Sequence, residues 1–130
     1  MHNLNPISPL GNTKPLSEEF GSYTLSEITS YSLASFTLRK GTEGDARKII
    51  EQFIQGSLPD IMTSNFGKIS SFWIGPSQWL IEAPMETHED LAGDLTEIAN
   101  GTASVTEQTD AWCRFDLKGQ ELASPLSLLC

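Results

Sequence analysis

The hydrophobic positions of this chain recur with two spacings, one typical of strands and one typical of helices. In the stretch SLASFTLRK, Ala34, Phe36 and Leu38 alternate with polar residues, which predicts a half-buried strand. The same alternation marks segments before and after it. We therefore also expect strands at residues 23–28, 103–109 and 111–118.

Two further segments follow the helical spacing of three and four residues. The apolar stripe residues are Ala46, Ile49, Ile50, Phe53 and Ile54 in the first helix and Leu91, Leu95 and Ile98 in the second. A Thr-x-x-Asp sequence precedes each stripe, at Thr42 and Thr87, and predicts the helix starts. Gly56 ends the first predicted helix, and Asn100-Gly101 ends the second.

Between these helices, the sequence FWIGPSQWLIEAP predicts a β-hairpin. Two apolar runs, residues 69–74 and 78–83, flank the short Gly-Pro-Ser turn. Trp73 lies on the first strand and Trp79 on the second. Because both faces of the hairpin are largely apolar, we expect it to be central in a sheet and covered on both sides.

The order of these elements predicts an α+β fold of the βαββαβ type, with a mostly antiparallel sheet and helices packed on one face. Residues 1–22 are rich in Pro, Ser, Asn and Gly and are expected to form a flexible N-terminal tail. Residues 23–130 are expected to form a single α+β domain. A third helix is predicted in ELASPLSLLC, starting near Ser124 because Pro125 fits poorly inside a helix.

The composition narrows the possible partners. The chain has 130 residues, with 8 basic against 17 acidic side chains and a formal net charge of -9. This acidity argues against binding to nucleic acid or to an anionic membrane surface. The longest apolar runs fall short of the ~20 residues of a membrane helix, and the N-terminus lacks the pattern of a signal peptide. With two cysteines and no disulfide framework, we expect a cytoplasmic protein.

The residues that most often carry chemistry are few and scattered. His2 lies in the tail, and His88 is expected at the surface in the first turn of the second helix. Cys113 is expected to face the core from the last strand, and Cys130 is terminal. Two His and two Cys at these spacings do not form a zinc pattern, so no metal site is predicted.

Three other features were considered as sites. The loop at residues 41–44 precedes a helix, but Glu43 and Asp45 would repel a phosphate there. Glu107, Asp110 and Asp116, near one strand turn, are interpreted as solvated strand ends rather than a catalytic pair; Glu82 is the other acidic residue of the expected strands. Trp73 and Trp79 could stack on a flat ligand, yet their apolar surroundings favour packing. No catalytic or cofactor-binding residue is therefore predicted.

Three motifs, taken together, resemble the gamma subunit of heterotetrameric sarcosine oxidase. Residues 73–80 (WIGPSQWL) match its Trp-hydrophobic-Gly-Pro-x-x-Trp-Leu hairpin. Residues 107–110 (EQTD) match an Asp-Gln-Ser-Asp-like strand, with Glu107 in place of the usual first Asp. Residues 117–119 (LKG) match a hydrophobic-x-Gly step into a helix. The resemblance extends over residues 23–130.

The resemblance implies a fold similar to the folate-binding domain of the glycine-cleavage aminomethyltransferase. It implies a non-catalytic subunit that assembles with alpha, beta and delta subunits. Such a complex demethylates sarcosine to glycine, produces hydrogen peroxide and transfers the one-carbon unit to tetrahydrofolate. FAD, FMN, NAD and tetrahydrofolate would be held by the other subunits, and none by this chain. Members of the family continue beyond the position of Cys130, so further residues are expected after it.

Two alternatives stay open, together with a question of self-association. The chain could be a stand-alone folate-binding or aminomethyltransferase-like domain, or a ferredoxin-like regulatory module that binds a small ligand. The apolar residues Leu126, Leu128 and Leu129 are expected to pack on the chain's own sheet or on a second copy, which would give a homodimer.

Overall fold

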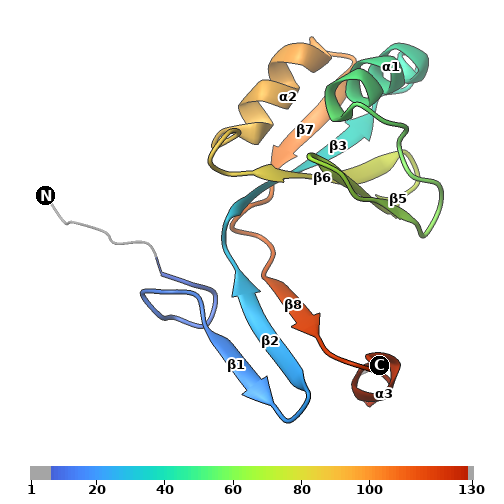
Figure 1. Ribbon diagram of the computed structural model, residues 1–130. Helices are drawn as coiled ribbons and strands as arrows, with labels where there is room; N and C mark the ends of the chain where they lie inside the picture. The colour runs from blue at the N-terminus through green and yellow to red at the C-terminus, as the bar shows by residue number, and fades with distance from the viewer. Residues whose placement is uncertain (1–6, 129–130) are drawn as a thin grey trace, which may run out of the picture. The chain divides into compact units, whose positions relative to one another are not determined.

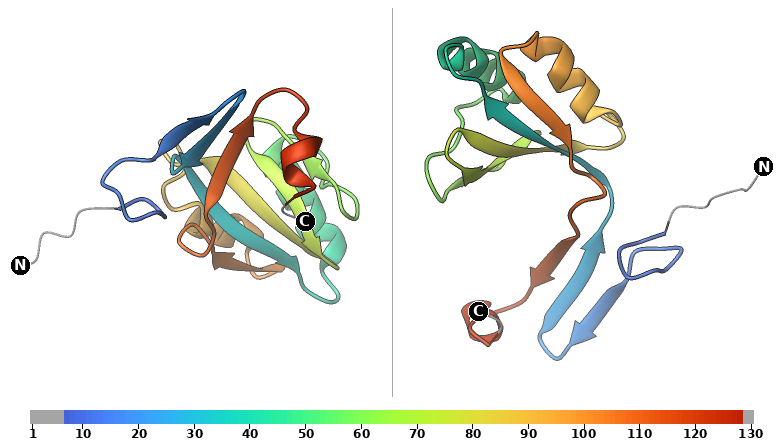
Figure 2. Two further views of the ribbon diagram at one scale, coloured as in Figure 1. Left: turned by 90° about the horizontal axis from the view of Figure 1, so that it is seen from below. Right: turned by 180° about the vertical axis from the view of Figure 1, so that it is seen from behind.

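The computed structural model describes residues 7–128, which form an α+β arrangement of two antiparallel sheets and short helices (Figures 1 and 2). The strands are β1 (Ser17–Phe20), β2 (Tyr23–Ile28), β3 (Tyr31–Leu38), β4 (Ser64–Asn65), β5 (Ser70–Gly75), β6 (Gln78–Pro84), β7 (Ala103–Glu107) and β8 (Arg114–Lys118). The helices are α1 (Glu43–Ile54), α2 (Leu91–Ala99) and α3 (Ala123–Leu126).

The chain divides into two compact units where a single domain over 23–130 was expected. The central unit comprises residues 30–111 and holds the five-stranded sheet with α1 and α2. The terminal unit joins the two ends of the described chain, residues 7–29 and 112–128, around the three-stranded sheet. Strands from both ends pair in that sheet because β8 lies next to β2.

The central unit follows the predicted order of strand, helix, two strands, helix and strand, with the two-residue β4 added between α1 and the hairpin. Its strand order is β4-β5-β6-β3-β7, and every neighbouring pair is antiparallel. The connection from β3 through α1 to β5 therefore skips over β6, as in a split β-α-β arrangement. The predicted hairpin is formed by β5 and β6, joined by a tight turn at Pro76 and Ser77.

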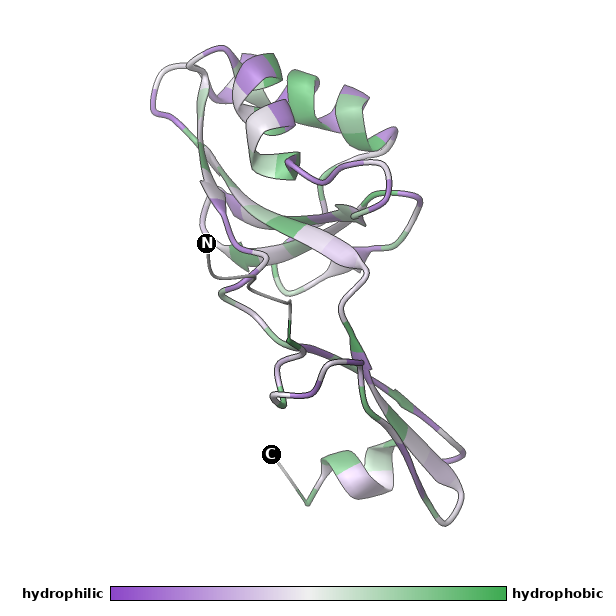
Figure 3. Ribbon diagram, turned by 90° about the vertical axis from the view of Figure 1, so that its left-hand side faces the viewer, coloured by the Kyte–Doolittle hydropathy of each residue, from purple (hydrophilic) through white to green (hydrophobic). Residues whose placement is uncertain are grey.

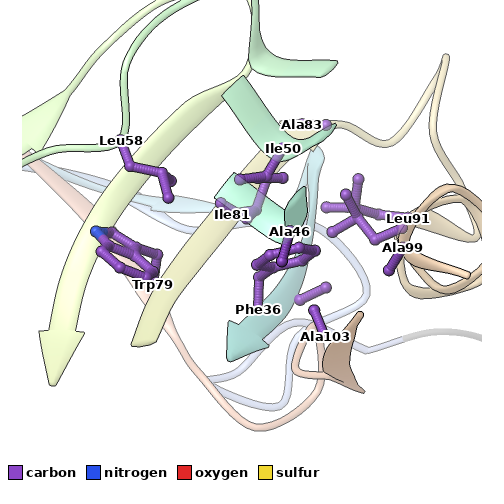
Figure 4. Close-up of a cluster of buried hydrophobic side chains, with 12 residues drawn as sticks. Phe36, Ala46, Ile50, Leu58, Trp79, Ile81, Ala83, Leu91, Ala99 and Ala103 are labelled. Atoms are coloured by element: carbon purple, nitrogen blue, oxygen red, sulfur yellow. The ribbon is translucent and has the colours of Figure 1, made fainter. Parts of the chain in front are cut away.

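The core of the central unit lies between one face of this sheet and both of its helices, α1 and α2 (Figure 4). Phe36 pairs with Trp79 on one side and Val105 on the other, and Ala34 pairs with Ile81. Paired residues of antiparallel strands point to the same face, so these side chains form one apolar layer. The helices contribute Ala46, Ile50, Leu91, Leu95 and Ala99 to it. The predicted stripes thus face the core.

The opposite face of the hairpin is less covered than predicted. Phe72 and Leu80 are half-buried there, and Ile74 is 42% exposed. Phe66, which precedes β5, packs edge-on against Phe72 with ring centroids 5.6 Å apart, yet 79% of Phe66 is exposed. The expectation of two covered faces is therefore only partly met, because α1 and α2 both pack on the other side.

The helix ends differ from the predicted caps. The Thr42 hydroxyl does not cap α1; it donates to the carbonyl of Thr102 at 2.8 Å. The second helix begins at Leu91 rather than near Thr87, because the Asp90 carboxylate accepts the hydrogen bond from the Gly93 N–H at 2.9 Å. At the other end, Asn100 adopts the left-handed conformation expected for a helix C-terminus.

In the terminal unit, part of the expected tail is a strand. Residues 17–20 form β1, which pairs in antiparallel register with β2, so that Ser17 lies opposite Ser26 and Phe20 opposite Tyr23. The C-terminal apolar segment forms only the single turn α3, and Leu126 and Leu128 are 45% and 85% exposed. Within the described residues, Leu128 is thus largely uncovered and Leu126 about half covered; Leu129 lies outside them.

A buried carboxylate holds the segment before β1 against the sheet. Glu27, on β2, is 4% exposed and accepts hydrogen bonds from the N–H groups of Leu10, at 2.8 Å, and Leu16. Burial raises the pKa of the Glu27 carboxyl, but the hydrogen bonds from Leu16, Leu10 and the Ser8 hydroxyl outweigh burial and lower the pKa below its usual value. The ionised form therefore organises residues 8–16.

We predict that Trp79→Ala destabilises the chain by about 3–5 kcal/mol, because it empties part of the core and leaves the Pro59 carbonyl without the indole donor. Urea unfolding followed by far-UV circular dichroism measures the loss. Trp112→Ala is the control: this tryptophan is 55% exposed, and its removal is expected to cost about 1 kcal/mol or less. Equal losses in the two variants would contradict the packing role of Trp79.

Glu27 also predicts a pH dependence. Because its pKa is lowered in the folded chain, its contribution is complete above the ordinary carboxyl pKa of about 4.3 and is lost as the pH falls through the lower folded value. We expect the amides of Leu10 and Leu16 to lose hydrogen-exchange protection below about pH 4. In Glu27→Gln this protection should be low already at pH 7. Unchanged protection factors in the variant would refute the role of the carboxylate.

Candidate functional site

The central unit contains a small open cleft beside the hairpin. Its lining residues are Arg47, Pro59, Asp60, Ile61, Trp73, Pro76, Ser77 and Trp79. They come from α1, from the loop that follows it and from the two strands of the hairpin with their turn. The cleft measures about 250 Å³, slightly below the ~300–1,000 Å³ of typical small-molecule pockets. It therefore fits a side chain or a single ring better than a large cofactor.

The two hairpin tryptophans form the apolar wall of this cleft. Trp73 lies directly opposite Trp79 in the β5–β6 register, so both side chains point to the helix-covered face. Trp79 is 4% exposed, and its indole N–H donates to the Pro59 carbonyl at 3.0 Å. The N–H is the one hydrogen-bonding group of an indole, so Trp79 has no further hydrogen bond to offer a ligand. Trp73 is half-buried and offers its ring to the cleft.

Arg47 supplies the positive charge at the cleft. Its guanidinium carbon lies 5.2 Å from the centroid of the Trp79 ring, within the range of a cation–π contact. The same group lies 3.4 Å from a carboxylate oxygen of Glu51, one helical turn further along α1. That oxygen also accepts a hydrogen bond from the Leu58 N–H at 3.1 Å. Glu51 thus ties the arginine to the loop that carries Pro59.

The groups that line the cleft are suited to binding. Its lining offers one hydroxyl, on Ser77, and one carboxylate, on Asp60, but no His, Cys or Lys. An activated serine needs a base within hydrogen-bond reach, and no lining residue has the imidazole or amine that commonly serves. An aromatic wall beside a guanidinium instead suits a flat or apolar group that carries a negative charge.

The other candidates from the sequence lie apart from this cleft. His88 is half-buried just before α2: its ring meets Phe53 edge-on at 5.8 Å, and its Nδ1 lies 2.9 Å from the Thr87 hydroxyl. Cys113 is exposed and precedes β8, so the expectation of a core cysteine was wrong. The strand begins only at Arg114, so Cys113 lies before it in the preceding loop. His2 and Cys130 lie outside the described residues.

The acidic residues are distributed over both units and do not share one environment. Glu107 and Asp110 belong to the central unit, where the Glu107 carboxylate accepts a hydrogen bond from the Thr109 N–H. Asp116 belongs to the terminal unit and pairs with Arg114 at 3.2 Å. Glu82 is 5% exposed on β6, next in sequence to Ile81 of the core layer. Each carboxylate whose contacts are described thus serves a local turn or strand.

Two features of the structure were not predicted from the sequence: the contacts that form the cleft, and the buried carboxylate of Glu27. Arg47 and Pro59 meet Trp79 only through tertiary contacts, so no local pattern indicates the cleft. Glu27, in contrast, left a signal. It follows Tyr23 and Leu25 in steps of two, so a carboxylate occupies a position where the alternation places an apolar residue.

Among residues 7–128, no group of three His, Cys, Asp or Glu side chains is arranged to hold a metal ion. Within the same range, no helix combines the length and the apolar character that crossing a bilayer requires.

By sequence, the chain matches neither a protein family nor a curated protein. By structure, it is similar to a chain of the heterotetrameric sarcosine oxidase from Corynebacterium sp. U-96, solved in complex with pyrrole 2-carboxylate. The two share a TM-score of 0.64 and 16% sequence identity, over 78% of this chain. The match spans 52%, or about half, of the chain of that enzyme. At this identity, the likeness shows a common fold.

We predict that Arg47→Ala lowers the free energy of unfolding by about 1 kcal/mol, the sum of a partly exposed cation–π contact and an i,i+4 ion pair. Lys48→Ala is the matched control, since Lys48 is exposed on the same helix and should change stability by less than about 0.5 kcal/mol. Urea midpoints distinguish the two. If both variants unfold at the same urea midpoint, the contacts of Arg47 with Trp79 and Glu51 do not stabilise the fold.

Proposed function

We propose that the chain is a non-catalytic subunit of a sarcosine oxidase-like complex, of the gamma type. The observation that carries the proposal is the fold, which 78% of this chain shares with a chain of a heterotetrameric sarcosine oxidase. The Trp-Gly-Pro-Trp hairpin supports it as well, because Trp79 and the turn build the core and the cleft of the central unit.

In this proposal the chain contributes assembly and support. The larger subunits hold FAD, FMN, NAD and tetrahydrofolate and carry out the demethylation of sarcosine. The cleft offers an aromatic wall and a guanidinium, which are groups suited to binding. The acidic net charge of -9 suits a protein partner with a basic surface.

The alternative of a stand-alone folate-binding domain has weaker support. A pterin with its glutamyl tail needs a pocket in the range of drug-sized ligands, and the cleft of about 250 Å³ falls below that range. A smaller aromatic anion fits the arrangement of Trp73 and Arg47 better. Ligand binding in the cleft would be compatible with a subunit role.

We expect the chain purified alone from an unrelated host to be colourless and to produce no hydrogen peroxide from sarcosine. Purified with a tag from its native host, it should co-elute with flavin-containing subunits in fixed stoichiometry and show sarcosine-dependent peroxide formation. Absorbance at flavin wavelengths and mass spectrometry of the co-eluting proteins measure both results. A flavin spectrum that persists through dialysis of the isolated chain would refute the non-catalytic role.

A further inference from the structure

The three-stranded sheet of the terminal unit has one apolar face. In its register, Phe20 pairs with Tyr23, Leu25 with Leu117, and Glu27 with Phe115, and paired residues share a face. The open apolar face is defined by Phe20, Tyr23, Leu25, Phe115 and Leu117. Its apolar side chains are notably exposed: Phe20, at the end of β1, is 55% exposed, and Leu25 and Phe115, inside their strands, are 38% and 40% exposed. Figure 3 shows apolar positions, in green, along these strands.

An antiparallel sheet of this size needs a cover on its apolar face. Sheets of three strands gain independent stability when that face packs against another layer, as the central sheet does against α1 and α2. The segment held by Glu27 adds further exposed apolar side chains, Leu10 at 56% and Leu16 at 36%. Together these residues make an apolar surface of a kind that marks an interaction site.

The charges on this sheet are divided between its two faces. Glu18 pairs with Leu25 and Glu27 with Phe115, so both carboxylates belong to the open apolar face. The two basic residues of the three strands, Arg114 and Lys118, pair with Ile28 and Thr24 and point to the other face. Glu27 is buried by the segment that it binds, so the exposed carboxylate of Glu18 is the negative charge beside the open apolar face, and none of the three strands places a cation on it.

This division of charge disfavours a second copy as the cover. Two copies stacked face to face would bring their Glu18 carboxylates into one interface without a compensating strand cation, and each copy carries a net charge of -9. Pairing of two copies through the edges of β1 or β8 would lengthen the sheet but leave the face uncovered. A different protein with an apolar surface and basic residues at its rim satisfies both requirements.

We propose that the open apolar face is the docking surface for another subunit, one that presents apolar side chains surrounded by Lys or Arg. The proposal rests on the proposed function, since the partner is a larger subunit of the same sarcosine oxidase-like complex. Phe115 and Leu25 are the central contacts, because they lie on neighbouring strands of the sheet. Aromatic and aliphatic side chains in such positions commonly dominate the affinity of an interface.

The experiment compares tagged full-length variants purified from the native host. Phe115→Asp and Leu25→Asp are expected to recover at least tenfold less of the flavin-containing subunits than the unaltered chain. Met62→Asp is the matched control, because it introduces the same charge at an apolar residue that is 85% exposed in the central unit. Recovery of flavin-containing subunits by both face variants at the level of the control would overturn the proposal.

A second measurement does not depend on the folding of the aspartate variants. A photo-crosslinking amino acid at position 115 is expected to attach the chain to a flavin-containing subunit, and the same group at position 62 is not. Crosslinks from position 115 to a second copy of the chain, or none at all, would overturn the docking surface while the proposed function stands. Failure of the unaltered chain to recover any flavin-containing subunit would overturn the proposed function and the docking surface together.

Discussion

An alternating strand has one apolar side, and that side must be covered; this constraint organises both units of the chain. In the central unit, β3 and β6 place Phe36, Ile81 and Trp79 on one face, and α1 and α2 complete the core. In the terminal unit, a buried carboxylate and the segment it binds cover only part of the corresponding face. The need to cover an apolar face thus explains why helices pack on the sheet of the central unit, and it indicates that the sheet of the terminal unit requires a cover as well.

The sequence predicted the elements whose contacts are local or strictly periodic. The stripes around Ile50 and Leu95 were sufficient for the helices, and the Gly-Pro turn was sufficient for the hairpin. Helix α1 begins directly after Thr42 as predicted, but neither Thr42 nor Thr87 caps a helix with its hydroxyl. Both hydroxyls donate to other carbonyls, those of Thr102 and Pro84, and Asp90 caps α2 instead. Strand β1 was missed because SEEF carries little apolar signal by itself and is held by its pairing with β2.

The candidate cleft illustrates what periodicity cannot supply. Trp79 was correctly interpreted as a packing residue, but its partners Arg47 and Pro59 lie 32 and 20 positions away in sequence. Their contacts depend on how α1 and its following loop return to the hairpin. The result is an aromatic wall, held by Arg47 and Pro59, beside a shallow cleft that suits the recognition of a small group.

The central claim is that the open apolar face of the terminal unit is covered by another subunit, and hydrogen–deuterium exchange tests it most directly. Exchange is compared between the isolated chain and the chain in the complex purified from its host. We predict slower exchange of peptides spanning residues 23–28 and 114–118 in the complex, with little change in the central strands around Ile81. Equal exchange of those two segments in both states would contradict it.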